Sequence, residues 1–211
     1  FAKGLQQHSD LQTFKIINYN LPPSPWLGDT VLPILQRSGN SHEFEGNVTT
    51  LELSNCSLSA DDLTALAKFL TGNKTLWSLN ISHNNIESVD TVKALAKAIK
   101  KHPALLEVGL AYCSLGGGNH DALDKVLVAC KECDSLEIGH SDFDSEGVAI
   151  IAKFLGKKNS LTSFSLMGAV VDKDNKKLLT RSLTKDKTIE KLCLHSNGLR
   201  LPAILSNNKK V

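Results

Sequence analysis

The stretch Leu76-Trp-Ser-Leu79-Asn-Ile81-Ser-His-Asn84-Asn-Ile86 decides the fold of this chain. Leu79 and Ile81 alternate with polar residues, which predicts a strand with one face buried. The whole stretch matches the repeat template L-x-x-L-x-L-x-x-N/C-x-L, in which an asparagine or cysteine follows the strand. The fold therefore depends on whether the same pattern recurs along the chain.

The pattern recurs at a period of 28 or 29 residues. Five further copies in phase with this one begin at Val48, Leu105, Cys133, Leu161 and Ile189. A weaker copy begins at Leu11, 37 residues before the next, so residues 21–47 contain an insertion between the first two strands. We expect seven strands, one in each repeat.

Between the strands the apolar spacing becomes helical. Leu63, Leu66, Ala67 and Leu70 lie at i, i+3, i+4 and i+7, which places them on one face of a helix. Later copies of this spacing are Val92, Leu95, Ala96, Ile99 and Val148, Ile151, Ala152, Leu155. One strand–loop–helix unit cannot bury its own apolar face, so neighbouring units stack until a continuous core forms. The sequence predicts an α/β solenoid, a horseshoe arc with parallel β-strands on its concave face and α-helices on its convex face.

The asparagine or cysteine place has its own physical role. A buried Asn84 or Asn197 can satisfy backbone groups in the turn after the strand. Cys56 and Cys113 fill the same place with fewer hydrogen bonds.

These repeats resemble the ribonuclease-inhibitor-like subfamily of leucine-rich repeats, over nearly the whole chain from Leu5 to Leu199. The resemblance implies the leucine-rich-repeat solenoid fold. It does not choose a function, because such repeats occur in the Ran GTPase-activating protein, tropomodulins, NOD-like receptors and secreted effectors of intracellular bacteria.

Composition narrows the class of protein further. Aromatic residues make up 5% of the 211 residues and the formal net charge is +2, so the charge balance does not indicate a polyanionic partner. The five cysteines are odd in number and scattered, which favours free thiols in a reducing, cytoplasmic compartment. No run of 18 apolar residues exists that would indicate a membrane span.

We interpret residues 1–211 as a single leucine-rich-repeat domain of about seven repeats, and as a fragment of a longer chain. Phe1, Ala2 and Leu5 occupy helix positions of an incomplete repeat. The insertion contains the stiff stretch Leu21-Pro-Pro-Ser-Pro-Trp26, which is either a docking element or a surface loop whose Trp26 folds back over the core.

Motifs that carry chemistry elsewhere have structural explanations in this chain. Cys130-Lys-Glu-Cys133 has redox or zinc spacing, but Cys133 falls on a core position and no second ligand pair follows. His42-Glu-Phe-Glu lacks the second histidine of a metalloprotease helix, and Gly116-Gly-Gly118 lacks the trailing Gly-Lys-Ser/Thr of a phosphate loop. His83, His140 and His195 lie on alternate strands, about 10 Å apart, which is too far to share a metal. We therefore expect neither a metal nor a cofactor.

The repeat phase places the residues between the core leucines on the concave face. The candidate partner-binding residues there are Glu52, His83, Glu107, Tyr112, Glu137, His140, Met167 and His195. Interfaces favour aromatic residues and methionine, whereas the lysines gather on the helical side. We expect a monomeric protein-protein interaction module that binds a protein or peptide through the concave strand face, with no enzyme activity and no nucleic-acid or membrane partner.

Three alternatives remain at this point. The chain could be a GTPase-activator-like repeat domain, which would need an arginine or asparagine on a strand-to-helix loop, whereas Arg37 lies in the insertion. It could be a secreted effector of an intracellular bacterium that acts on host proteins in the host cytosol. It could also be a passive scaffold within a larger protein.

Overall fold

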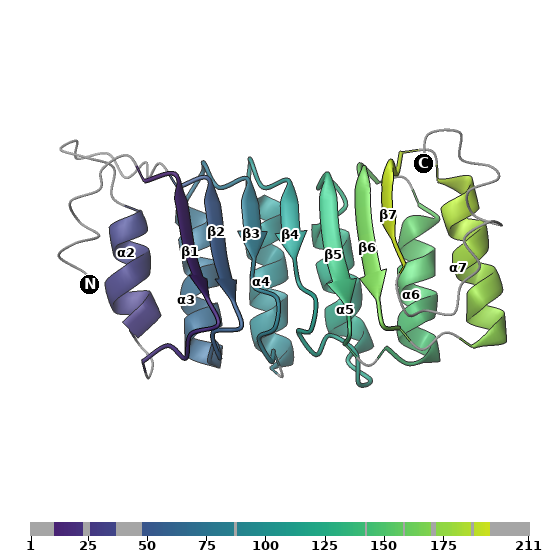
Figure 1. Cartoon of the computed structure of the whole chain (residues 1–211), viewed down its shortest axis with the longest axis horizontal. Helices are drawn as coiled ribbons and strands as arrows, with labels where there is room; N and C mark the ends of the chain where they lie inside the picture. Colours follow the sequence, from purple (N-terminus) through teal and green to yellow (C-terminus); the bar gives the residue numbers. More distant parts are fainter. Residues whose placement is uncertain are drawn as a thin grey trace.

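The computed structural model describes residues 11–22, 26–36, 48–86, 88–141, 143–157, 159–169, 172–186 and 188–194. Within them the chain forms one parallel sheet whose strands follow the order of the sequence (Figure 1). The strands are β1 (Thr13–Ile17), β2 (Thr50–Ser54), β3 (Ser78–Asn80), β4 (Glu107–Gly109), β5 (Ser135–Gly139), β6 (Ser163–Met167) and β7 (Lys191–Cys193). The predicted α/β leucine-rich-repeat solenoid is confirmed.

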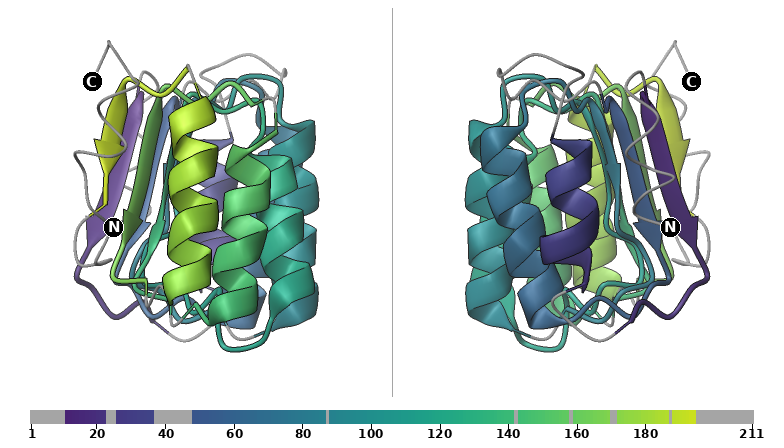
Figure 2. Two further views of the ribbon diagram at one scale, coloured as in Figure 1. Left: turned by 90° about the vertical axis from the view of Figure 1, so that its right-hand side faces the viewer. Right: turned by 90° about the vertical axis from the view of Figure 1, so that its left-hand side faces the viewer.

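A layer of helices covers one face of the sheet and leaves the other open (Figure 1). The helical segments are η1 (Leu27–Val31), α2 (Leu32–Leu35), α3 (Ala60–Gly72), α4 (Val89–Lys101), α5 (His120–Ala129), α6 (Ser145–Leu155) and α7 (Lys173–Lys185). In the side views β1 and β7 stand farther from the helices than the middle strands do (Figure 2). The open face of the sheet is therefore concave, as the sequence predicted.

The register of the sheet stacks equivalent apolar residues of neighbouring repeats. One such row contains Phe14, Leu51, Leu79, Val108, Leu136, Phe164 and Leu192, paired in that order from β1 to β7. Leu51, Leu79 and Leu136 are each 1% exposed or less, so the row forms the inner layer of a continuous core. The helix residues that the sequence predicted, such as Leu66 and Ile151, are buried against it.

Asn84 links two neighbouring repeats through a buried side chain. Its amide nitrogen donates to the carbonyls of Leu53 at 2.7 Å and Ile81 at 2.8 Å, and its Oδ1 accepts from the backbone N–H groups of Cys56 at 3.0 Å and Leu58 at 3.1 Å. Cys113 in the next repeat makes weaker contacts, with its Sγ 3.3 Å from the Ile81 carbonyl. The predicted difference between asparagine and cysteine at this place is confirmed, while Asn197 lies outside the described residues.

Side-chain caps begin the long helices where the sequence changes from strand to helix spacing. Ser59 caps α3 and forms a reciprocal capping box with Asp62. Ser88, Asp144 and Asp172 cap α4, α6 and α7 by accepting backbone N–H groups of the first turn. These caps fix where α3, α4, α6 and α7 start, and thereby the loops that lead from the open face into these helices.

Part of the 21–47 region is helical rather than extended. Leu27, Val31, Leu32 and Leu35 of η1 and α2 are all buried in the core. Trp26 is partly buried and packs against that core, as the surface-loop interpretation expected, while residues 23–25 and 37–47 lie outside the described residues. Within the described ranges, no helix has the length and apolar character needed to cross a membrane.

Candidate protein-binding face

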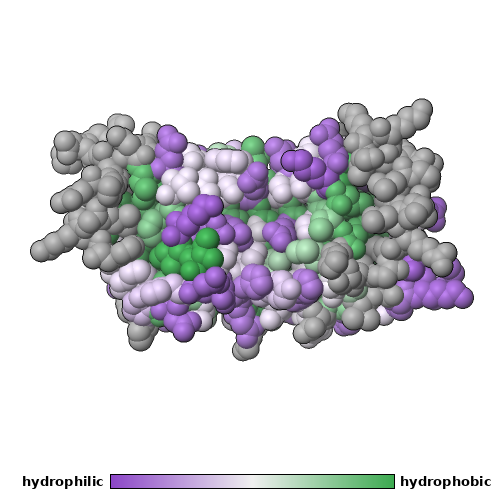
Figure 3. All heavy atoms as spheres, viewed as in Figure 1, coloured by the Kyte–Doolittle hydropathy of each residue, from purple (hydrophilic) through white to green (hydrophobic). Residues whose placement is uncertain are grey.

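The open sheet face is lined by the residues that alternate with the core leucines. Its rows across the sheet are Thr13, Thr50, Ser78, Glu107, Ser135, Ser163, Lys191; then Lys15, Glu52, Asn80, Gly109, Glu137, Ser165, Cys193. In Figure 3 this face shows pale and purple residues over its middle, with green, apolar areas towards both sides. The middle of the face is thus built mainly from small and polar side chains.

Glu52 is neutralised within the chain. Its carboxylate lies 2.9 Å from the Nζ of Lys15 and accepts hydrogen bonds at 3.3 Å from Ser54 and Asn80. Its side chain is only 18% exposed. Of the predicted carboxylates, this one joins β1, β2 and β3 and offers little free charge to a partner.

Glu107 and Glu137, which we call the acidic pair, lie around Gly109. Gly109 pairs with Glu137 on the neighbouring strand, and Glu107 stands two residues before Gly109 on β4. Both carboxylates are half-buried, and neither has an ion-pair partner among the residues that the structure describes. Asn80 leans over Gly109 so closely that a Cβ there would lie 2.6 Å from the Asn80 Oδ1. The Asn80 amide therefore fills the space above Gly109, and a side chain at position 109 would require Asn80 to shift.

His83, Tyr112 and His140 form a continuous stack of three rings, which we call the ring stack. The ring of Tyr112 lies 4.1 Å from each histidine ring, at interplanar angles of 15° and 9°. Both faces of the Tyr112 ring are thus covered, while the residue remains 40% exposed. The stacking leaves the polar ring edges, two imidazoles and one phenol, free of the neighbouring rings.

The ring stack occupies a turn that needs a left-handed backbone in every central repeat. The φ angles of His83, Tyr112 and His140 are 60°, 56° and 47°. Asn18 and Asn55, which tolerate this conformation, occupy the equivalent turns of the first two repeats. A bulky residue such as tyrosine rarely adopts a positive φ. The backbone at Tyr112 is therefore more strained than the equivalent asparagine backbones of the first two repeats.

Gly168 ends the ring stack on the side of β6. Its φ is 63°, and a Cβ added to it would lie 2.3 Å from the His140 Nδ1. Met167, the neighbouring predicted residue, is half-buried at the end of β6, and its carbonyl accepts the backbone N–H of His140 at 2.7 Å. The structure therefore brings the ring stack and Met167, four of the predicted residues, into one area, while His195 lies outside the described residues.

Trp77 and Leu106, which we call the edge pair, were missed by the sequence analysis. They are 42% and 39% exposed and directly precede the neighbouring strands β3 and β4. The Leu106 N–H donates to the Trp77 carbonyl at 2.9 Å, so the two residues lie side by side. The same place in other repeats holds Thr49, Asp134, Thr162 and Glu190. Two large apolar residues at a place that is otherwise polar were a signal that the sequence already contained.

The Cys130-x-x-Cys133 pair is part of the core. Both thiols are buried, the two side chains are hydrogen-bonded to each other, and Cys133 Sγ also lies 3.7 Å from the Leu105 carbonyl. The hydrogen bond to Cys133 and burial raise the pKa of Cys130, and burial raises the pKa of Cys113 to about 12. Cys130 and Cys113 are therefore poor nucleophiles, whereas the hydrogen bond with Cys130 lowers the pKa of the buried Cys133 thiol.

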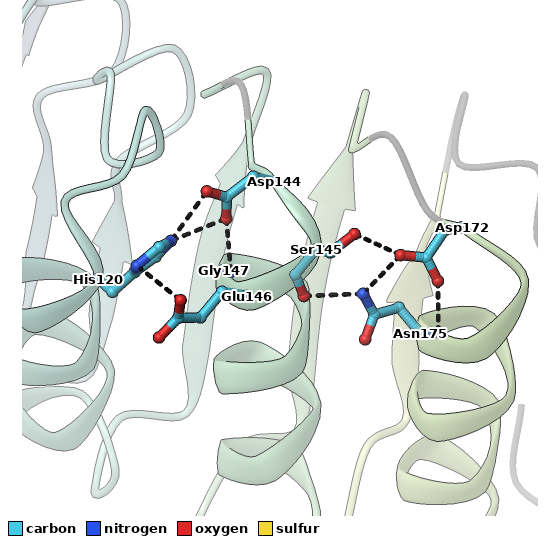
Figure 4. Close-up of polar contacts among 7 residues, drawn as sticks. All are labelled: His120, Asp144, Ser145, Glu146, Gly147, Asp172 and Asn175. Atoms are coloured by element: carbon cyan, nitrogen blue, oxygen red, sulfur yellow. Dashed lines mark hydrogen bonds and ion pairs between the residues drawn. The ribbon is translucent and has the colours of Figure 1, made fainter.

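His120 takes part in a second group of polar side chains, at the helix starts (Figure 4). Its Nε2 lies 2.8 Å from Asp144 Oδ1 and its Nδ1 lies 3.3 Å from Glu146. Ser145 points away from His120, and its hydroxyl donates to Asp172 instead. The hydroxyl, imidazole and carboxylate therefore do not form a nucleophilic triad, and these contacts tie α5, α6 and α7 together.

Asp144 and Asp172 are held ionised by their caps. The Gly147 N–H and His120 lower the pKa of Asp144. The Ser145 hydroxyl and the Asn175 N–H lower the pKa of Asp172. In the described part of the chain, no three histidine, cysteine or acidic side chains gather in a way that could hold a metal ion.

A hollow of about 610 Å³ opens near β1, lined by Lys15, Ile16, Ile17, Tyr19, Pro22 and Trp26. Ile17 and Tyr19 are 48% and 55% exposed, and the green area over β1 in Figure 3 lies on this side. Lys15 already pairs with Glu52, so the hollow offers mostly apolar contacts.

Comparisons with known proteins agree with the leucine-rich-repeat fold. The chain is 34% identical over 113 residues to human NACHT, LRR and PYD domains-containing protein 13, which covers 54% of the chain and 11% of that relative. It is 30% identical over 158 residues to mouse NACHT, LRR and PYD domains-containing protein 4C, covering 74% of the chain and 16% of the relative. It is 28% identical over 161 residues to mouse NACHT, LRR and PYD domains-containing protein 4E, which covers 75% of the chain and 16% of that relative.

The chain thus spans less than one fifth of the length of these three relatives. No model of a known protein family matches it. The names of the relatives include LRR domains, and the strand–helix repeats have the corresponding architecture. The chain is a protein of leucine-rich-repeat type, and this class supports a protein-interaction module in general terms.

Proposed function

We propose that the chain is a single binding domain of the ribonuclease-inhibitor-like subfamily that holds a protein or peptide partner on its concave face. The observation that carries the proposal is the ring stack beside the acidic pair, on a preformed rigid sheet. Tyr112 stays 40% exposed although both faces of its ring are covered, and the neighbouring carboxylates lack ion-pair partners among the described residues. Exposed aromatic residues held rigidly are typical interface anchors.

Binding fits the site better than catalysis does. The buried thiols are hydrogen-bonded within the core, and the serine and histidine at the helix starts bond to different carboxylates. Arg181, the one arginine in the described ranges, lies on α7 rather than on a strand-to-helix turn, so the GTPase-activator alternative would depend on an asparagine there, such as Asn85 or Asn119. We further propose a monomeric domain in a reducing, intracellular compartment, because its cysteines are free.

The relatives favour a setting for this domain. Their length and names support the proposal that the chain is the leucine-rich-repeat part of a larger protein that also contains other domains. In such a protein the concave face would bind either a separate protein or another part of the same chain.

An affinity capture from mammalian cell lysate tests the proposed function, since the relatives are human and mouse proteins. The test variant combines Tyr112→Ala, Glu107→Lys and Glu137→Lys. A matched variant on the helix side combines Leu178→Ala, Asp61→Lys and Asp124→Lys, three exposed residues of the same kinds. Partners captured by the wild type and the helix-side variant, and lost only from the concave variant, are the expected result. Equal capture by all three, or capture of nothing, would make the chain a passive scaffold.

A further inference from the structure

We infer that the partner presents a segment with a basic side chain, lysine or arginine, next to an apolar one. The basic group would lie between the carboxylates of the acidic pair and the apolar side chain on the edge pair. This inference rests on the proposed function, because it names the chemistry of the partner for the same face.

The apolar part of the surface lies where β3 and β4 begin. The carbonyl of Trp77 accepts the N–H groups of both Leu106 and Glu107 at 2.9 Å, so the edge pair and the first carboxylate are contiguous. Together the two side chains expose a tryptophan and a leucine beside each other on a rigid sheet edge. Tryptophan is strongly enriched among binding hot spots, where its large side chain buries apolar surface of the partner.

The charged part lies in the middle of the same strands. Glu52 is neutralised by Lys15, so the acidic pair supplies the free negative charge over β4 and β5. Lys191, the basic residue in the row of Glu107, lies three strands away on β7. Because the Asn80 amide fills the space above Gly109, a long cationic side chain would lie over that amide and meet both carboxylates from there. A guanidinium or ammonium group is the complement of such a pair.

The binding path that we infer runs along the strand direction from the edge pair to the ring stack. His83 of the ring stack lies six residues after Trp77. At roughly 3.3 Å per residue the path from Trp77 to His83 is about 20 Å long. About six extended residues, or a helix of about 13 residues, would span it. The ring faces are covered by each other, so the partner meets their polar edges through hydrogen bonds.

Two pools of synthetic 15-residue peptides test this inference on the intact chain. Each peptide of the first pool combines lysine or arginine with leucine, isoleucine or phenylalanine, and the second pool replaces every lysine and arginine by glutamate. We expect capture of the basic pool and not of the acidic pool, with affinity falling about tenfold or more for Glu107→Gln with Glu137→Gln. Trp77→Thr with Leu106→Thr, which installs the residue found at Thr49 and Thr162, should lower it by a similar factor.

Matched controls separate this inference from the proposed function. Asp61→Asn with Asp124→Asn removes two exposed carboxylates on the helix side and should leave peptide affinity unchanged. If acidic and basic peptides bind equally, and Tyr112→Ala still abolishes binding, the concave face binds partners but the inferred chemistry is wrong. If no pool binds, or if binding ignores all concave variants, both the inference and the proposed function are wrong. Urea unfolding midpoints of each variant show that the compared proteins are folded.

Discussion

Replacing Asn84 tests the physical basis of the repeat. In Asn84→Ala the backbone N–H groups of Cys56 and Leu58 lose their acceptor, and both are buried around a side chain that is 0% exposed. Each orphaned buried donor costs about 1–3 kcal/mol, so we expect the free energy of unfolding to fall by about 3 kcal/mol. The carbonyls of Leu53 and Ile81 also lose a donor, which makes this a minimum.

Asn84→Cys is the matched control, because the chain itself places cysteine there in two other repeats. The sulfur of Cys56 accepts a backbone hydrogen bond from Tyr19, and that of Cys113 accepts one from Asn84. A thiol therefore satisfies part of the site, and we expect a loss of about 1–2 kcal/mol, smaller than for alanine. Urea unfolding followed by circular dichroism at constant m-value measures both losses. An alanine variant within about 0.5 kcal/mol of the wild type, or a cysteine variant less stable than alanine, would refute the reasoning.

Three further predictions concern Gly168, the cysteines and two helix caps. Gly168→Ala should lower the free energy of unfolding by at least about 1 kcal/mol, since its φ is 63° and its Cβ would lie 2.3 Å from the His140 Nδ1; loss of the ring-current shift of His140 in NMR spectra would report the broken stack. Among the five cysteines only Cys193 is exposed, so a thiol reagent should modify one cysteine in the folded chain and five in urea; rapid modification of several thiols before unfolding would show that the core is open. Because the pKa values of Asp144 and Asp172 are lowered in the folded chain, their ionised forms stabilise the fold above about pH 4, and this contribution is lost as the pH falls through the folded-state pKa values. Between about pH 5 and pH 3 the urea midpoint should therefore fall less in Asp144→Asn with Asp172→Asn than in the wild type. An equal fall in both proteins would contradict this assignment.

The repeat period was sufficient to predict the sheet. Each strand centre, such as Leu79 or Leu136, was identified because a period of 28 or 29 residues brings chemically equivalent residues into register. The same reasoning predicted the hydrogen bonds of Asn84, because a buried amide in a turn must find backbone partners.

Other features depend on side-chain conformation or break the period, and the sequence did not reveal them. The helical segments at 27–35 lie in the apparent insertion, where the spacing of Leu27, Val31 and Leu35 is helical but stands out of phase with the later repeats. The ring stack needs three rotamers to agree, which repeat phase alone does not specify. The neutralised Glu52 likewise depends on the reach of Lys15 from the neighbouring strand.

Hydroxyl-radical footprinting of the chain with and without a captured partner tests the central claim most directly. This measurement reads the accessibility of individual side chains, and reactive side chains lie on both faces. We predict protection of Tyr112, Met167 and His83 on the concave face, with unchanged labelling of Leu178 and Val128, which are exposed on the helices. Protection of the helix residues with unchanged labelling of Tyr112 would place the partner on the convex side and contradict the account.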